Sequence, residues 1–310
     1  MDHGEPICNI LALILVGVFV YFIHHISSSI QVSAISCAIS RETMDLVEHF
    51  FPEKCGGIED EELPAMIGEL EWQPIPARVM GYIQTVDVTS LAAFAEKHKV
   101  ILKMEYGVGD FVTPYSPILS FSGPESFRDV AVDALEQFFA VDTYRTIEQD
   151  PAFGIRQLVD IALKALSPSI NDTTTAVNCI EHLSVILMSV AQRHMPSPLH
   201  CERGVLRVIA KQPCFEQLVV LSFHQILENA EGNTEILLRL IDAIARIVTV
   251  TTLKKRTDVL RQWMHQVGEV GLRSVKSGYA LDEIKRHIVL ARDVLDKGAN
   301  RLNHSARHVV

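Results

Sequence analysis

The sequence predicts a mostly α-helical fold with a small β module and an N-terminal transmembrane helix. Three observations support this fold class. Apolar residues recur at helical spacing beyond residue 125, two runs between residues 79 and 106 are strand-like, and an almost uninterrupted apolar run opens the chain. We therefore expect four segments: a membrane helix with its juxtamembrane segment (1–39), an amphipathic helix with an acidic linker (40–76), a small α/β module (77–124) and a helical domain (125–310).

The N-terminal apolar run extends from Ile7 to Ile23, and Asn9 is its only strongly polar residue. At about 1.5 Å per residue this length is near the lower limit for crossing about 30 Å of hydrocarbon, and extension to Ile26 makes a tilted span. A signal peptide is the alternative. It is less favoured because no Lys or Arg precedes the run and no A-x-A cleavage site follows it.

Charge and cysteine content indicate the partners and the compartment. The net charge of −10 argues against a nucleic-acid partner, whose binding surface would be basic. The cysteines form no C-x-x-C pair and no zinc-like spacing, which fits a reducing compartment. Arg41 and Lys54 follow the apolar run, so the positive-inside rule predicts a cell (inner) membrane protein with a cytoplasmic C-terminal domain. We expect no metal and no cofactor.

The α/β module is predicted from two strands, residues 79–86 and 100–106, with a short helix over residues 91–98 between them. The sequence GDFVTPYSPILSF then resembles the hairpin of lipoyl-like modules, which implies a small half-barrel, although Tyr115 stands where those modules have glycine. Lys103 lies in a Lys-Met-Glu sequence similar to a biotin-attachment site. Because it precedes the hairpin instead of following it, we do not expect it to be modified.

Helices are predicted for most of the remaining chain. One of them carries Glu235, Arg239, Asp242 and Arg246 as a stripe of alternating charge, which is typical of a solvated helix edge. A short strand is also predicted over residues 204–209. The expected helices cover residues 40–51, 126–139, 153–166, 173–193, 215–229, 235–250, 256–276 and 281–297.

The segment from Asp150 to Ala176, DPAFGIRQLVDIALKALSPSINDTTTA, predicts two helices joined by a corner. Pro168 ends the first helix, because the residue before a proline avoids helical geometry. The candidate site residues lie on the first helix and in this corner. Three of them are four residues apart and share one helix face, and the other two are suited to capping the second helix: Arg156, Asp160 and Lys164, then Asn171 and Asp172.

This segment resembles the signature of DUF2254, a family of uncharacterised bacterial membrane proteins. The stretch FIHHISSSIQVSAIS also resembles the family's post-membrane segment. Several membrane helices usually precede that segment in the family, whereas one precedes it here. The chain is therefore expected to be either a shortened member of the family or truncated at its start. The resemblance implies an integral membrane protein with a sizeable non-membrane domain, and it implies no chemistry.

Two interpretations of the five site residues stay open. They form either an ion- or anion-binding site or a structural corner, and we favour the corner. For the whole protein we expect a non-enzymatic homo-oligomeric module of a transport or channel-type assembly in the lipid bilayer. The alternative is a membrane-anchored module that senses a ligand or partner. An enzyme is least favoured, because the sequence contains no evident nucleophile–base set, metal triad or phosphate loop.

Overall fold

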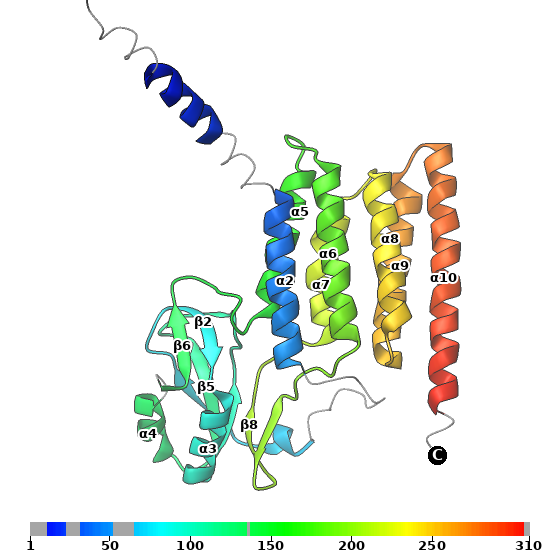
Figure 1. Cartoon of the computed structure of the whole chain (residues 1–310). Helices are drawn as coiled ribbons and strands as arrows, with labels where there is room; N and C mark the ends of the chain where they lie inside the picture. The colour runs from blue at the N-terminus through cyan, green and yellow to red at the C-terminus, as the bar shows by residue number, and fades with distance from the viewer. Residues whose placement is uncertain (1–10, 23–31, 52–64, 135–136, 307–310) are drawn as a thin grey trace, which may run out of the picture.

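The structure is a computed structural model that describes residues 11–22, 32–51, 65–134 and 137–306. It is mostly helical with a small β module, as the sequence predicts. A bundle of long helices lies beside this module (Figure 1). An apolar helix, Leu11–Phe22, precedes both.

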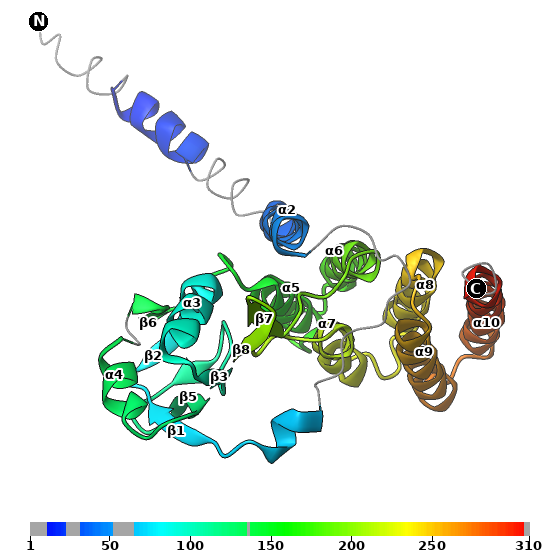
Figure 2. The same ribbon diagram turned by 90° about the horizontal axis from the view of Figure 1, so that it is seen from below.

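The helical bundle is built around α6 (Thr173–Ala191), which contacts α2, α5 and α8. Figure 2 shows the helices nearly end-on, in two staggered rows, with α2, α6, α8 and α10 in one and α5, α7 and α9 in the other. Apolar residues surround α6 on most sides, which explains its central position. The other bundle helices are α2 (Val32–Phe50), α5 (Pro151–Leu166), α7 (Phe215–Glu228), α8 (Thr234–Val250), α9 (Lys254–Ser274) and α10 (Gly278–Ala306).

Helix α2 begins at Val32, whereas the sequence predicted a start at residue 40. Its first turns bury Ser36 and Ser40, small polar residues that do not register as an apolar stripe. They allow close packing against α5 and α6. A Cβ atom at Gly154 of α5 would overlap the hydroxyl of Thr43, so glycine is required where these helices meet. Helix α10 also extends beyond its predicted end, to Ala306.

The β module contains two sheets. Its helices are α3 (Val88–His98) and α4 (Phe127–Ala134), and a short 3-10 helix, η1 (Ala65–Glu69), precedes its first strand. One sheet has the order β1 (Gln73–Pro76), β5 (Pro117–Ser122), β3 (Ile101–Met104), β8 (Val205–Ile209) and β7 (Leu199–Glu202). The other has the order β4 (Phe111–Val112), β2 (Gly81–Val86) and β6 (Phe139–Asp142).

The lipoyl-like half-barrel hairpin is not confirmed. Strands β4 and β5, which flank the expected turn, lie in different sheets: β4 pairs with β2, and β5 pairs with β1 and β3. The strand predicted over residues 204–209 is present as β8. It pairs in parallel with β3 and so belongs to the β module, although it lies far along the chain between α6 and α7.

The helix predicted over residues 126–139 is also corrected. Helix α4 ends at Ala134, and β6 follows and pairs with β2. Phe138 and Phe139 are buried in the core of the β module, so strand pairing and burial override the local helical spacing. The β module therefore extends beyond residues 77–124 and includes β6 and the β7–β8 hairpin.

Two apolar helices bear on the membrane prediction. Helix α6 is the one described helix that is long and apolar enough to cross a membrane, but half of that stretch is buried inside the bundle, as expected for a core helix. The helix Leu11–Phe22 is shorter, and all its residues are exposed. The other residues of the predicted span, 7–10 and 23–26, lie outside the described residues.

Candidate functional site

The corner between α5 and α6 has the predicted cap. The side chain of Asp172 accepts hydrogen bonds from the backbone N–H and the hydroxyl of Thr175, at 3.1 and 2.6 Å. These bonds hold the pKa of Asp172 below its usual value. Asn171 has a different role from the one predicted. Its φ of 49° is left-handed, so it forms the turn before the cap.

The predicted charged stripe on α5 is only partly brought together. Arg156 forms an ion pair with Asp160 and also donates a hydrogen bond to Gln225 of α7. Lys164 is exposed and has no ion-pair partner among the described residues. The stripe therefore contains one ion pair linked to a neighbouring helix.

A larger charge cluster lies between α6 and α8, and the sequence did not predict it. Both carboxylate oxygens of Glu181 on α6 accept hydrogen bonds from Arg246 on α8, at 2.5 and 3.0 Å. Arg239 of α8 donates a further bond of 2.8 Å to the same carboxylate. The Arg246 hydrogen bonds are the main reason that the pKa of Glu181 lies below its usual value, and they raise the pKa of Arg246. We call these three residues the Glu181 cluster.

A separate polar contact joins α8 to α10. Nδ1 of His287 lies 2.9 Å from Oδ1 of Asp242, and its Nε2 lies 4.0 Å from Glu283. The predicted solvated edge of α8 is thus corrected. Its i,i+4 pair Glu235–Arg239 exists, but the stripe also holds α8 against two other helices. A signal was present in the sequence, because Glu181 and His182 are the only residues of α6 that can carry charge, apart from its cysteine thiol.

The β module and the bundle meet at Asp150, the first residue of the signature segment. Its side chain is buried, caps α5 by accepting from the backbone N–H of Phe153, and pairs with Arg145 at 2.6 Å. Burial raises the pKa of Asp150 despite these partners. Gly109, in the loop before β4, has a φ of 86°, and a Cβ atom there would overlap the Asp150 carboxylate.

Arg256 on α9 is the largest charged side chain in the core. It is 2% exposed, and its Nη1 donates to the backbone carbonyls of Val190 and Arg193 at the end of α6. Its guanidinium carbon lies 5.2 Å from the centre of the Phe215 ring. A cation at the negative end of a helix is stabilised by the helix dipole, so Arg256 acts as a C-terminal cap for α6.

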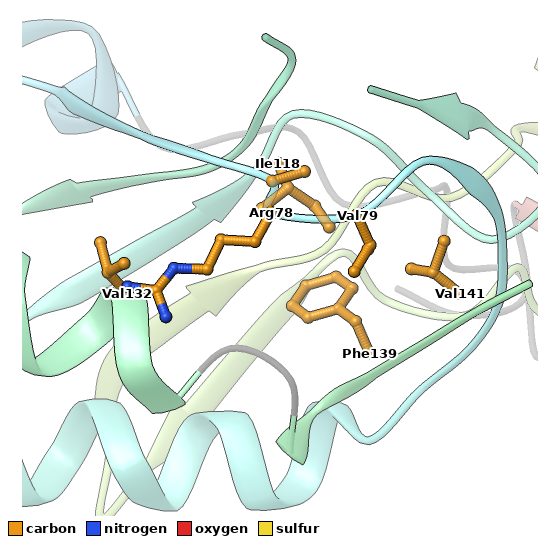
Figure 3. Close-up of a pocket in the computed structure, with 7 residues that line it drawn as sticks. Arg78, Val79, Ile118, Val132, Phe139 and Val141 are labelled. Atoms are coloured by element: carbon orange, nitrogen blue, oxygen red, sulfur yellow. The ribbon is translucent and has the colours of Figure 1, made fainter. Parts of the chain in front are cut away.

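The β module contains an apolar pocket of about 200 Å³. Figure 3 shows Val79 and Phe139 facing each other across it, with the Arg78 side chain extended towards Val132. The lining residues come from the β1–β2 connection and from β5, α4 and β6: Ala77, Arg78, Val79, Ile118, Val132, Phe139 and Val141.

Within the described parts of the chain, no group of three or more His, Cys, Asp or Glu side chains could hold a metal ion. The polar and apolar features described above are helix caps, ion pairs between helices and an apolar pocket beside an arginine. The caps and ion pairs can hold the helices together, and the pocket can accommodate a small molecule.

Comparison with known proteins identifies the relatives of the chain. The sequence model of a family described as "Predicted membrane protein (DUF2254)" matches residues 7–246. An uncharacterized protein of Mycobacterium tuberculosis (strain CDC 1551 / Oshkosh) is 31% identical over 245 residues, covering 76% of this chain and 47% of that protein. An uncharacterized protein of Mycobacterium bovis is 30% identical with the same coverage. The chain thus spans about half the length of the curated relatives it matches, and no solved structure matches it.

Proposed function

Because the chain belongs to the DUF2254 family of predicted membrane proteins, we propose that it is a membrane-anchored, non-enzymatic module of a transport or channel-type assembly. The observation that carries this proposal is the helix Leu11–Phe22. It is apolar, and its large side chains are 55–73% exposed, so none of the residues that the structure describes covers them. A bilayer would bury this surface.

The point at which the chain enters the bundle supports one orientation of the bundle relative to the bilayer. Residues 23–31 join the apolar helix to α2 and can span at most about 35 Å. Figure 1 shows that the start of α2 and the α5–α6 corner lie at one end of the bundle, with the β module at the other. In this proposal the corner faces the bilayer and the β module projects away from it.

The proposed assembly is a homo-oligomer in the cell (inner) membrane, with the bundle and β module in the cytoplasm. Helix α10 supports it with an apolar surface, since Val289 and Leu290 are 64% and 59% exposed. A second copy of the chain would bury them.

Membrane extraction tests the anchor. Val16→Arg places a charge within the apolar helix and should cost about 2.5–3.5 kcal/mol of insertion free energy. Carbonate extraction should then release the variant and leave the parent chain in the membrane. Val205→Arg on β8 is the matched control, because it adds the same charge to an exposed valine outside the anchor. Release of the parent chain, or of both variants equally, contradicts the proposal.

A membrane-anchored ligand-sensing module is the second candidate function. The apolar pocket of the β module favours it, because an apolar concave site with a few polar groups is the usual form of a small-molecule site. The two functions are compatible, since a sensing module can regulate the assembly that carries it.

A further inference from the structure

The apolar pocket has the size and lining of a site for a small molecule. Its volume of about 200 Å³ is well above the roughly 10–15 Å³ that one water molecule needs. It is smaller than the roughly 300–1,000 Å³ of sites for drug-sized ligands. Apart from Arg78, every described residue that lines it is alanine, valine, isoleucine or phenylalanine. Such a lining excludes polar ligands such as sugars, whose hydroxyl groups would lose hydrogen bonds to water.

Arg78 supplies one charge at this apolar surface. Its guanidinium pairs with Asp133 of α4 at 3.1 Å, and the two side chains are 51% and 80% exposed. Exposed ion pairs of this kind contribute only about 0–1 kcal/mol, so Asp133 is a partner that a ligand can displace. A carboxylate is a good competitor, because it can accept two parallel hydrogen bonds from a guanidinium group.

We propose that this pocket binds a small amphiphilic monocarboxylate, with its apolar chain between Val79 and Phe139 and its carboxylate on Arg78. The inference deepens the second candidate function and rests on it. The ligand comes from the aqueous phase, because the β module and the start of α2 lie at opposite ends of the bundle (Figure 1). Chains of about four to eight carbons suit a cavity below drug size.

Calorimetric titration of the intact chain in nanodiscs tests this proposal. Detergent is avoided because its own apolar chain would compete for the pocket. Hexanoate is the probe, hexanol lacks its charge, and empty nanodiscs give the background from partition into lipid. We expect saturable binding of hexanoate to the protein and binding of hexanol that is at least about tenfold weaker, a loss of about 1.4 kcal/mol.

Four variants identify the site. Arg78→Gln should weaken hexanoate binding about tenfold and leave hexanol unchanged. Asp133→Asn removes the competing carboxylate and should strengthen hexanoate binding a few-fold. Val79→Trp fills the pocket and should abolish binding, whereas the control Val205→Trp, at an exposed valine on β8, should not.

Three outcomes overturn the proposal. They are an absence of saturable binding, equal affinity for hexanoate and hexanol, and unchanged or weaker hexanoate binding in Asp133→Asn. Each variant is also melted, so that a loss of binding through unfolding is recognised. Asp133→Asn changes only an exposed side chain and is expected to fold as the parent does. Failure here leaves the extraction result for Val16→Arg untouched, so the pocket and the membrane anchor are tested separately.

Discussion

Glu181 and Arg246 join α6 to α8 through two parallel hydrogen bonds, of 2.5 and 3.0 Å. Glu181 also accepts from Arg239, so one carboxylate serves two guanidinium groups. Glu181→Gln should therefore cost about 1–2 kcal/mol of unfolding free energy, between the values for exposed and buried ion pairs. The matched control is Glu235→Gln, which removes a more exposed carboxylate whose ion pair with the same Arg239 is longer, at 3.6 Å. Urea unfolding measures both, and an equal effect of the two variants would contradict a special role for Glu181.

The same cluster predicts a dependence of stability on pH. The pKa of Glu181 is lowered in the folded chain from the ordinary value of 4.5, so the folded state binds fewer protons than the unfolded state in this range. The stabilisation is complete above the unfolded pKa and is lost as the pH falls through the lower folded pKa. The difference in unfolding free energy between the parent and Glu181→Gln should be constant above about pH 5.5 and decrease below about pH 4.5. A difference that grows in acid would refute this.

Asp150 predicts a contrast between two substitutions at the junction of the β module and the bundle. Asparagine keeps an oxygen that can accept from the N–H of Phe153, whereas alanine removes it. Asp150→Ala should thus be less stable than Asp150→Asn by about 0.5–2 kcal/mol, the usual effect of losing an N-cap. Both variants lose the ion pair with Arg145, so that loss cancels in the comparison. Equal unfolding midpoints would show that capping is not the role of Asp150.

The sequence predicted the long helices correctly because their signals are local. Helices α5 and α6 have apolar residues at regular spacing, a proline after the first and a capping aspartate before the second, and all these signals lie within a few residues. The predicted start of α2 and the predicted end of α4 were wrong because the contacts that determine them are not local. Ser36 is buried by α6, and Phe139 by the β module, and neither contact is visible in the local pattern.

The sequence marks Glu181 as unusual on α6, but its partners could not be predicted because they depend on which helices are neighbours. Glu181 and Arg246 are 65 residues apart, and the sequence offers nearer partners for each. The parallel pairing of β3 with β8 is likewise a contact between distant segments, so the β module was predicted without its last two strands. Among the candidate site residues, the pair Arg156–Asp160 and the cap Asp172 follow from spacing alone and are present.

Cysteine labelling tests the proposed cytoplasmic position of the folded domain. Cys201 and Cys214 are exposed, so their accessibility reports which side of the membrane they occupy. An impermeant thiol reagent should leave them unlabelled in intact cells and label them after permeabilisation. Cys179 is buried and serves as the internal control, because burial raises its pKa and it should react in neither case. Labelling of Cys201 in intact cells would place the domain on the opposite side.

The geometry of the corner predicts how substitutions at the candidate site residues change stability. Asn171 has positive φ, so Asn171→Gly should be nearly neutral, whereas Asn171→Ala should cost about 1 kcal/mol through backbone strain. Asp160→Asn should cost at most about 1 kcal/mol, because Asp160 is more than half exposed. Asp172→Ala should lower the melting temperature, and Asp172→Ser should restore part of it by keeping an acceptor for the N–H of Thr175.

If the corner is only structural, each of these variants should lose function only to the extent that it loses stability. Thermal melts of each variant are therefore compared with a membrane-phenotype assay of the same protein. Asn171→Gly is the most informative, since it keeps the backbone geometry and removes the side chain. If it melts as the parent does and works as the parent does, the Asn171 side chain has no binding role. Normal melting with abolished function in Asn171→Gly or Asp160→Asn would instead identify the corner as a binding site.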